Sequence, residues 1–227
     1  MLKNLSALLL GGSCFLCRGA ASDVLCGPCT ESLPRLPEEG CPRCALPSPA
    51  SAICGRCLAQ PPRYDATVAA LWYEFPADAL VHALKFRGEL ALAPLLARLL
   101  AERLRGGPPV DFVLAVPLSS GRLAERGYNQ SLELARRLAA RAGAPLEPTG
   151  CTRIRETPQQ ANLPWAERAR NVRGAFRSER GFAGQTIAVV DDVMTTGATL
   201  DELAATLKAA GAERVVNWVL ARTPPPA

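Results

Sequence analysis

The chain has 227 residues, of which 48% are hydrophobic and 21% are charged, the balance of an ordinary globular protein. This composition excludes a disordered chain, and the apolar runs are too short or too interrupted for a membrane-spanning helix. The formal net charge is +5, and most of the excess lies in residues 152–180, which hold seven arginines and three glutamates. A mildly basic chain is a weak indication of a polyanionic partner.

The first ten residues combine one lysine with a short apolar stretch. This pattern predicts a short amphipathic helix over Met1–Leu10, and the apolar stretch is too short for a secretory signal. We therefore expect a cytoplasmic location, where thiols stay reduced and paired cysteines usually bind a metal ion.

Eight of the nine cysteines lie in the first 57 residues and form four Cys-x-x-Cys pairs, Cys14/Cys17, Cys26/Cys29, Cys41/Cys44 and Cys54/Cys57. One tight turn presents both sulfurs of a pair to the same ion, and two turns complete a site of four thiolates. Intervals of eight, eleven and nine residues separate the pairs, which favours joining the first with the second and the third with the fourth; an interleaved pairing remains open. We predict two structural zinc ions, with disulfides, a redox dithiol or an iron–sulfur cluster as alternatives.

The cysteine-rich segment 1–60 is expected to form a small zinc-ribbon domain that depends on its metals for folding. Its net charge of +1 argues against strong DNA binding by this domain alone. The stretch 58–62 contains two prolines and predicts a linker, so we expect a second domain over 61–227 with a hydrophobic core of its own. Cys151 stands apart from the other cysteines and is expected to be a buried thiol.

Strands and helices are predicted to alternate after the linker. Strands are expected at 66–75, 111–116, 186–191 and 213–221, and helices at 77–86, 90–105, 121–142 and 198–210. Residues 145–176 contain four prolines and predict an irregular excursion. This alternation is typical of an α/β fold with a mainly parallel sheet.

The stretch 187–199 is the most informative part of the sequence. Four apolar residues predict a strand that ends at Asp191 and Asp192, where α/β sheets bind ligands. A loop over 195–199 with three threonines and Gly197 follows, and its N–H and hydroxyl groups suit an anion. We expect the two acids at a solvent-facing strand end, where they can accept hydrogen bonds from a sugar diol.

These thirteen residues resemble, at every position, the loop that binds 5-phosphoribosyl-1-pyrophosphate (PRPP) in type I phosphoribosyltransferases. The segments 116–130, 155–160 and 168–176, with the cysteine module in front, resemble the ComF family over nearly the whole chain. That family includes competence and gluconate-utilisation-associated homologues. The resemblance implies a type I phosphoribosyltransferase-like sheet flanked by helices.

The resemblance also implies residue roles. Asp191 and Asp192 are the catalytic candidates and would bind the ribose 2′- and 3′-hydroxyls. The 5′-phosphate would be held by Thr195, Thr196, Gly197, Ala198 and Thr199, and the pyrophosphate, with Mg²⁺, by the loop carrying Ser119, Arg122 and Arg126. A plain surface position on a helix is the alternative for the two arginines. Residues 152–176 correspond to a mobile hood, and Lys85 is a further candidate to face the site; the single histidine, His82, is expected to be incidental.

Three functions remain open from the sequence. The first is an Mg²⁺-dependent phosphoribosyltransferase, and the second is a PRPP- or nucleotide-binding module without chemistry. The third, implied only by the family, is an accessory of DNA uptake that binds single-stranded DNA or a competence helicase. The basic segment 152–180 supports the third slightly, but its few aromatic residues offer little stacking surface. The phosphoribosyl acceptor and the oligomeric state stay open.

Overall fold

The computed structural model describes residues 12–156 and 171–224. The helix predicted over Met1–Leu10 and the central part of the predicted hood, 157–170, lie outside the described residues. Within these two ranges, no helix combines the length and apolar character needed to cross a bilayer.

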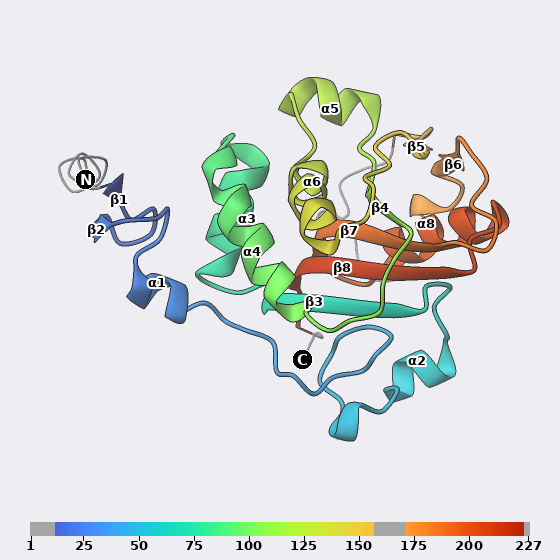
Figure 1. Cartoon of the computed structure of the whole chain (residues 1–227), viewed down its shortest axis with the longest axis horizontal. Coiled ribbons are helices and arrows are strands. Elements are labelled where there is room, and N and C mark those ends of the chain that lie inside the picture. The colour runs from blue at the N-terminus through green and yellow to red at the C-terminus, as the bar shows by residue number, and fades with distance from the viewer. Residues whose placement is uncertain (1–11, 157–170, 225–227) are drawn as a thin grey trace.

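The centre of the molecule is a four-stranded parallel sheet (Figure 1). Its strands are β3 (Ala66–Trp72), β8 (Arg214–Arg222), β7 (Thr186–Met194) and β4 (Phe112–Ala115), in that spatial order. The two inner strands are almost continuously apolar and buried, as expected for a parallel sheet covered on both faces. The predicted α/β class is therefore confirmed.

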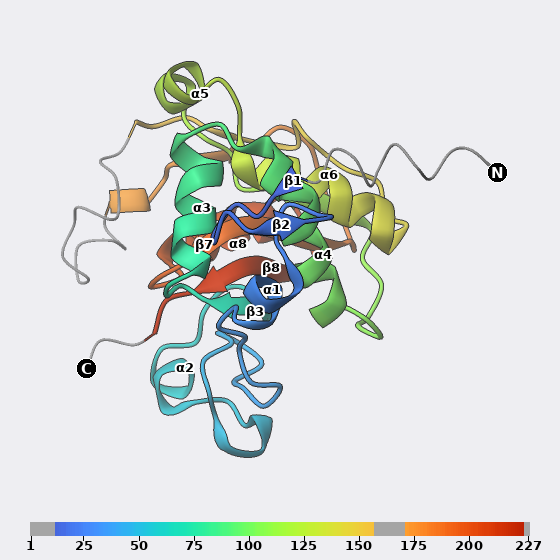
Figure 2. The same cartoon turned by 90° about the vertical axis from the view of Figure 1, so that its left-hand side faces the viewer.

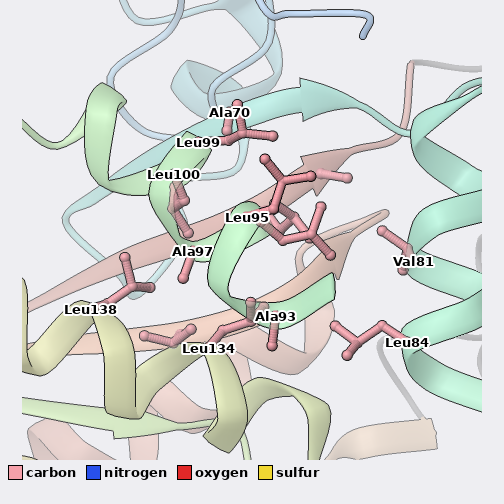
Figure 3. Packing of buried hydrophobic residues seen from close by; sticks show 14 of the residues in the cluster. Ala70, Val81, Leu84, Ala93, Leu95, Ala97, Leu99, Leu100, Leu134 and Leu138 are labelled. Atoms are coloured by element: carbon pink, nitrogen blue, oxygen red, sulfur yellow. The ribbon is translucent and has the colours of Figure 1, made fainter. Parts of the chain in front are cut away.

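Helices cover both faces of this sheet. The short 3₁₀ turn η2 (Leu90–Leu92) and the helices α3 (Ala77–Phe86), α4 (Ala93–Arg103) and α6 (Gln130–Ala142) pack on one face, and α8 (Ala198–Ala209) packs on the other. Figure 3 shows the leucines of α4 meeting Leu134 and Leu138 of α6 and Val81 and Leu84 of α3. These side chains lie at helical spacing on one face of each helix, which is why the three helices pack together.

The helix predicted over 121–142 is wrong in one respect, because the structure divides it into α5 (Ser120–Arg126) and α6. Gly127 ends α5 in the left-handed conformation, with φ of +79°. Asn129 then begins α6, since its side-chain oxygen accepts hydrogen bonds from the N–H groups of Ser131 and Leu132 at 3.0 and 3.3 Å. A helix stop and a helix start thus stand two residues apart.

The predicted excursion contains a small antiparallel pair, β5 (Cys151–Arg153) with β6 (Phe176–Ser178). Cys151 is buried in it, as predicted, and burial raises the pKa of its thiol to about 12. This pair lies beside α8 at the edge of the molecule.

The cysteine-rich segment contains only short elements, the strands β1 (Gly12–Ser13) and β2 (Ala20–Ala21), the helices α1 (Gly27–Glu31) and α2 (Gly55–Ala59), and the 3₁₀ turn η1 (Pro49–Ser51). Its cysteines form two groups, each with its four sulfurs within 4.8 Å of one another. The first cluster is Cys14, Cys17, Cys26 and Cys29, and the second cluster is Cys41, Cys44, Cys54 and Cys57. Sequential pairing is therefore confirmed, and interleaved pairing is wrong.

The expectation of two separate hydrophobic cores is also wrong. The first cluster packs on α3 and α4, and Figure 2 shows β1 and β2 lying across these helices. The second cluster shares a core with Tyr64 and with the leucines of α8. Between the clusters, Leu36 donates its N–H to the Ala70 carbonyl at 3.1 Å and so covers the outer edge of β3. The cysteine-rich segment has few large apolar residues of its own, and it buries them against the helices and strands of the larger domain.

Candidate functional site

Two loops predicted to act together meet at the carboxyl edge of the sheet. The strands β4 and β7 are parallel neighbours, and the Val116 N–H donates to the Val190 carbonyl at 3.0 Å just beyond the end of β4. Val116, where the loop toward α5 begins, therefore lies beside the end of β7 that carries Asp191. Ligands of open parallel sheets bind at this edge.

Asp191 and Asp192 are more deeply placed than the sequence predicts. The strand β7 continues to Met194, so both acids lie inside the strand and only 9% and 3% of their surfaces are exposed. The expectation of a solvent-facing strand end is wrong, because α6 and α3 also cover this part of β7.

Asp191 is held by two donors. The Ser131 hydroxyl, in the first turn of α6, donates to Asp191 Oδ1 at 3.2 Å, and the Asp192 N–H donates to the same oxygen at 2.9 Å. Burial, together with the neighbouring Asp192 carboxylate, raises the pKa of Asp191 to about 7. Asp191 is thus poised to change its charge near neutral pH.

Asp192 forms an ion pair with Lys85 from the last turn of α3. Lys85 Nζ lies 3.1 Å from Asp192 Oδ2, and the lysine side chain is 28% exposed. Burial alone would lower the pKa of Lys85, but the charges of Asp192 and Asp191 outweigh it and raise that pKa. The structure therefore places Lys85 beside Asp192, one of the two predicted site acids.

The loop 195–199 turns the chain from β7 into α8. Gly197 adopts φ of +86°, and its carbonyl accepts the Asp201 N–H at 2.8 Å in the first turn of α8. The Thr196 hydroxyl accepts the Ala198 N–H at 3.1 Å, which tightens the turn. The loop therefore presents a helix N-terminus and threonine hydroxyls, which are suited to an anion.

Arg122 and Arg126 line a cavity of about 260 Å³ beside this edge. Lys85, Phe86 and Tyr128 line it as well. The Arg126 guanidinium lies 5.1 Å from the centre of the Phe86 ring, and burial, together with Arg126, lowers the pKa of Arg122. The two predicted arginines and Lys85 thus gather around one cavity.

Ser119 is 2% exposed and stands at the start of α5. The next turn holds a carboxylate, because Glu156 Oε1 accepts the Gly121 N–H at 2.9 Å. This hydrogen bond lowers the pKa of Glu156. An anionic group therefore already sits on the loop that the sequence assigns to pyrophosphate.

The sequence analysis did not identify four residues that lie at or next to the candidate site: Ser131, Tyr64, Arg56 and Arg222. Ser131 follows the helix-start signal at Asn129, so its place at the beginning of α6 was recoverable. The other three carry no local signal, because they reach the site from the cysteine-rich segment, from the residues that follow it and from the end of β8.

Two family models match the chain. The double zinc ribbon domain matches residues 5–58, and the phosphoribosyl transferase domain matches residues 95–225. The first match and the two groups of four sulfurs together support two structural zinc sites. Among solved structures, a purine phosphoribosyltransferase from Pyrococcus horikoshii is 21% identical with a TM-score of 0.36, covering 70% of this chain and 79% of its own.

Relatives match along almost their whole length. The DNA utilization protein YhgH of Salmonella typhi is 38% identical over 226 residues, which cover 95% of this chain and 99% of that protein. Competence protein F of Haemophilus influenzae is 32% identical over 222 residues, which cover 92% of this chain and 96% of that protein. The chain therefore belongs to the ComF family, in which a double zinc ribbon precedes a phosphoribosyltransferase domain.

Proposed function

We propose that this protein binds PRPP at the carboxyl edge of the sheet and transfers its phosphoribosyl group with release of pyrophosphate. The observation that carries the proposal is the juxtaposition of the buried pair Asp191 and Asp192, a turn at 195–199 whose threonine hydroxyls and helix N-terminus suit an anion, and a cationic cavity beside Lys85. Ribose, monophosphate and pyrophosphate need these three kinds of surface.

Asp191 and Asp192 would accept hydrogen bonds from the ribose 2′- and 3′-hydroxyls. Both acids are buried, so such bonds form with little competition from water, and bonds to charged acceptors are the strong ones. In their ionised forms these carboxylates also favour the positive charge that develops on the ribose ring as the bond at C1 breaks.

The two phosphate-bearing ends of the ligand would lie on either side of the acids. The 5′-phosphate takes the loop of Thr195, Thr196, Gly197, Ala198 and Thr199. The pyrophosphate would take Ser119, Arg122 and Arg126, and the hydrogen bond from the Gly121 N–H to the Glu156 carboxylate supports an anion at this turn. Lys85 adds a cation between the cavity and Asp192.

The residues at this edge also fit Mg²⁺. Magnesium prefers carboxylate and water oxygens, and Asp191 and Asp192 supply two adjacent carboxylates. When bound with PRPP, the ion would neutralise charge on the departing pyrophosphate. Lys85 and the two cavity arginines carry out the same neutralisation from the protein side.

Calorimetry with PRPP and Mg²⁺ tests the binding step, and pyrophosphate release with a panel of bases and with single-stranded DNA tests the transfer. PRPP binding with pyrophosphate release in the presence of one acceptor supports the enzyme. PRPP binding with no release for any acceptor would support the alternative, a non-catalytic PRPP- or nucleotide-binding module. Absence of PRPP binding at millimolar Mg²⁺ would overturn the site assignment.

A second function, binding of single-stranded DNA, is favoured by a specific surface. Arginine side chains lie over two aromatic rings near the end of α3: Arg126 over Phe86 at 5.1 Å, and Arg87 and Arg18 over Phe15 at 5.3 and 5.8 Å. Phe86 is 51% exposed. Cationic grooves with exposed aromatic rings bind single strands by charge and base stacking.

This surface differs from the arginine-rich segment 152–180 that the sequence favours. In that segment Arg177 pairs with Glu179 and Arg180 with Glu147, so part of its charge is neutralised, while Arg168 and Arg170 lie outside the described residues. Replacing Phe86 by Ala should weaken single-stranded DNA binding, whereas Phe75→Ala, at another exposed phenylalanine, should not. Equal effects of the two substitutions would remove this surface from the proposal.

The names of the relatives, DNA utilization protein and competence protein, also suit this second function. A cytoplasmic location, which suits the paired cysteines, and a competence helicase as a partner belong to the same proposal. Cell fractionation and co-purification with that helicase test the two points.

A further inference from the structure

Arg222 joins the second cluster to the loop that follows β7. It is the last residue of β8 and has no exposed surface. Its Nε donates to the Cys44 carbonyl at 3.0 Å, and its Nη1 donates to the Met194 carbonyl at 2.8 Å and to the Thr195 carbonyl. A guanidinium is a rigid planar fork, so it fixes these carbonyls relative to one another.

A second contact holds the same loop from the same side. Tyr64 is 2% exposed, and its hydroxyl lies 2.9 Å from the position where a β-carbon on Gly197 would stand. Arg43, between Cys41 and Cys44, donates to the Tyr64 carbonyl at 2.9 Å. The tip of the loop is therefore packed against a side chain that the second cluster holds in place.

The second cluster also bounds the space in front of the loop. A cavity of about 490 Å³ has Arg56 and Cys57 of α2 on one wall and Thr196, Gly197 and Ala198 on the other. Arg56 thus brings a cation from the cysteine-rich segment to the loop that suits a phosphate.

The first cluster has different neighbours. Cys14 shares a core with α3 and α4 on the opposite face of the sheet, and Arg98 of α4 donates to Asp23 at 2.8 Å. The two clusters therefore contact different parts of the molecule, although their cysteine spacings are alike.

We propose that the second cluster is a structural part of the phosphate site and that Arg222 is a positioning residue, which transmits the order of that cluster to Met194 and Thr195. Loss of the metal from the second cluster then loosens the loop 195–199, whereas loss of the metal from the first does not. The consequence for PRPP affinity rests on the proposed function; the coupling between cluster and loop does not.

Cys26 and Cys54 provide a matched pair of substitutions. Each is the third cysteine of its cluster, precedes a short helix as its N-cap and is half-buried. In the zinc-loaded full chain, hydrogen exchange of the peptide covering 194–200 should become about tenfold faster in Cys54→Ser and remain unchanged in Cys26→Ser. Equal exchange in the two variants would overturn the coupling. Zinc content by elemental analysis verifies that each variant has lost one ion.

Arg222→Lys tests the role of Arg222 separately from that of the cluster. Lysine keeps the positive charge but lacks the planar guanidinium that binds several carbonyls at once. It should accelerate exchange over 194–200 to a similar degree while both zinc ions stay bound. Wild-type exchange over 194–200 in this variant would overturn the role of Arg222. Exchange of α6 serves as the measure of global unfolding, and acceleration there to the same extent in Cys54→Ser and Arg222→Lys would also count against a local coupling.

Calorimetry with PRPP and Mg²⁺ then tests the consequence for the ligand. We expect at least about tenfold weaker binding in Cys54→Ser and Arg222→Lys and wild-type affinity in Cys26→Ser. Wild-type affinity in all three would overturn this consequence. If the wild-type protein itself fails to bind PRPP, the proposed function is wrong, and the exchange measurements alone decide the coupling.

Discussion

Lys85 and Asp192 stand 107 positions apart in the chain, yet Lys85 Nζ lies 3.1 Å from an oxygen of the Asp192 carboxylate. This ion pair ties the end of α3 to the central strand β7. It also places a positive charge beside two buried acids that would otherwise repel each other. The pair therefore matters for the stability of the site as well as for its charge.

Replacing Lys85 by Met removes this charge and leaves Asp192 buried without its cation. We expect the free energy of unfolding to fall by about 1–3 kcal/mol. The double variant Lys85→Met with Asp192→Asn should recover most of that loss, because the uncompensated charge is gone. Urea denaturation at pH 7.5 measures both values; additive effects of the two substitutions would show that the pair is not coupled.

Asp191 gives the protein a pH-dependent stability. Its pKa is raised from 3.8 to about 7, so the folded state holds the proton more tightly than the unfolded state. This contribution is complete below pH 4 and is lost as the pH rises through about 7. Between pH 5.5 and 8, Asp191→Asn should therefore gain about 1–2 kcal/mol of stability relative to the wild-type protein.

Thermal or urea unfolding at several pH values within that window measures the difference between the two proteins. The window avoids strong acid, which protonates the zinc thiolates in both. A difference that stays constant from pH 5.5 to 8 would mean that Asp191 is ionised throughout.

The elements were predictable where their signals are local. The helix expected at 77–86 has the bounds of α3, and the one expected at 198–210 differs from α8 by a single residue. Both were predictable because apolar spacing and helix-end signals depend only on residues close together in the sequence. The break at Gly127, which the helix predicted over 121–142 missed, also carries a local signal, because an Asn–Gln–Ser helix start begins two residues after the glycine. The burial of Asp191 carries no such signal, since it depends on Ser131 and α6, sixty positions away.

Thr196→Val should weaken PRPP binding by roughly 10- to 100-fold, because a hydroxyl donor to a charged phosphate is lost while the shape is kept. The same change removes the acceptor of the Ala198 N–H, so Thr196→Ser, which restores the hydroxyl, should recover the affinity. Thr206→Val is the control, since the Thr206 hydroxyl bonds within α8 to the Glu202 carbonyl. Calorimetry with PRPP and Mg²⁺ compares the four proteins, and equal losses in Thr196→Val and Thr206→Val would contradict the role of the loop.

Glu156 occupies the start of α5 with a negative charge that pyrophosphate would have to displace. Glu156→Gln should therefore increase the affinity for inorganic pyrophosphate with Mg²⁺ by about two- to fivefold. Glu179→Gln makes the same change of charge on a carboxylate that pairs with Arg177 instead. A competition assay measures both variants; equal gains would point to overall charge rather than to this turn.

The purified protein should contain about two zinc ions per chain, one for each group of four sulfurs. Elemental analysis provides the measurement. Abundant iron in place of zinc would replace the ribbon interpretation with an iron–sulfur one.

The sequence predicts the chemical groups of the candidate site better than it predicts the residues that surround them. The run 187–199 holds its acids and threonines within one short stretch, so sequence alone predicts the kind of ligand. Arg222 contacts Cys44 although the two residues are 178 positions apart in the sequence, and no periodicity or spacing predicts such a contact. The expectation of independent cores failed for the same reason, because burial between segments is decided by tertiary packing.

The strand order has a consequence for how the molecule assembles. The strand β8 follows β3, β4 and β7 in the chain but lies between β3 and β7, so β3 joins the rest of the sheet only when β8 arrives. During synthesis the cysteine pairs emerge early, whereas Arg222, which links the second cluster to Met194 and the loop 195–199, emerges only with the end of β8. The nascent chain therefore cannot complete its sheet before residue 222 has left the ribosome, and the second cluster, even when already loaded with metal, gains its contact with Arg222 only then.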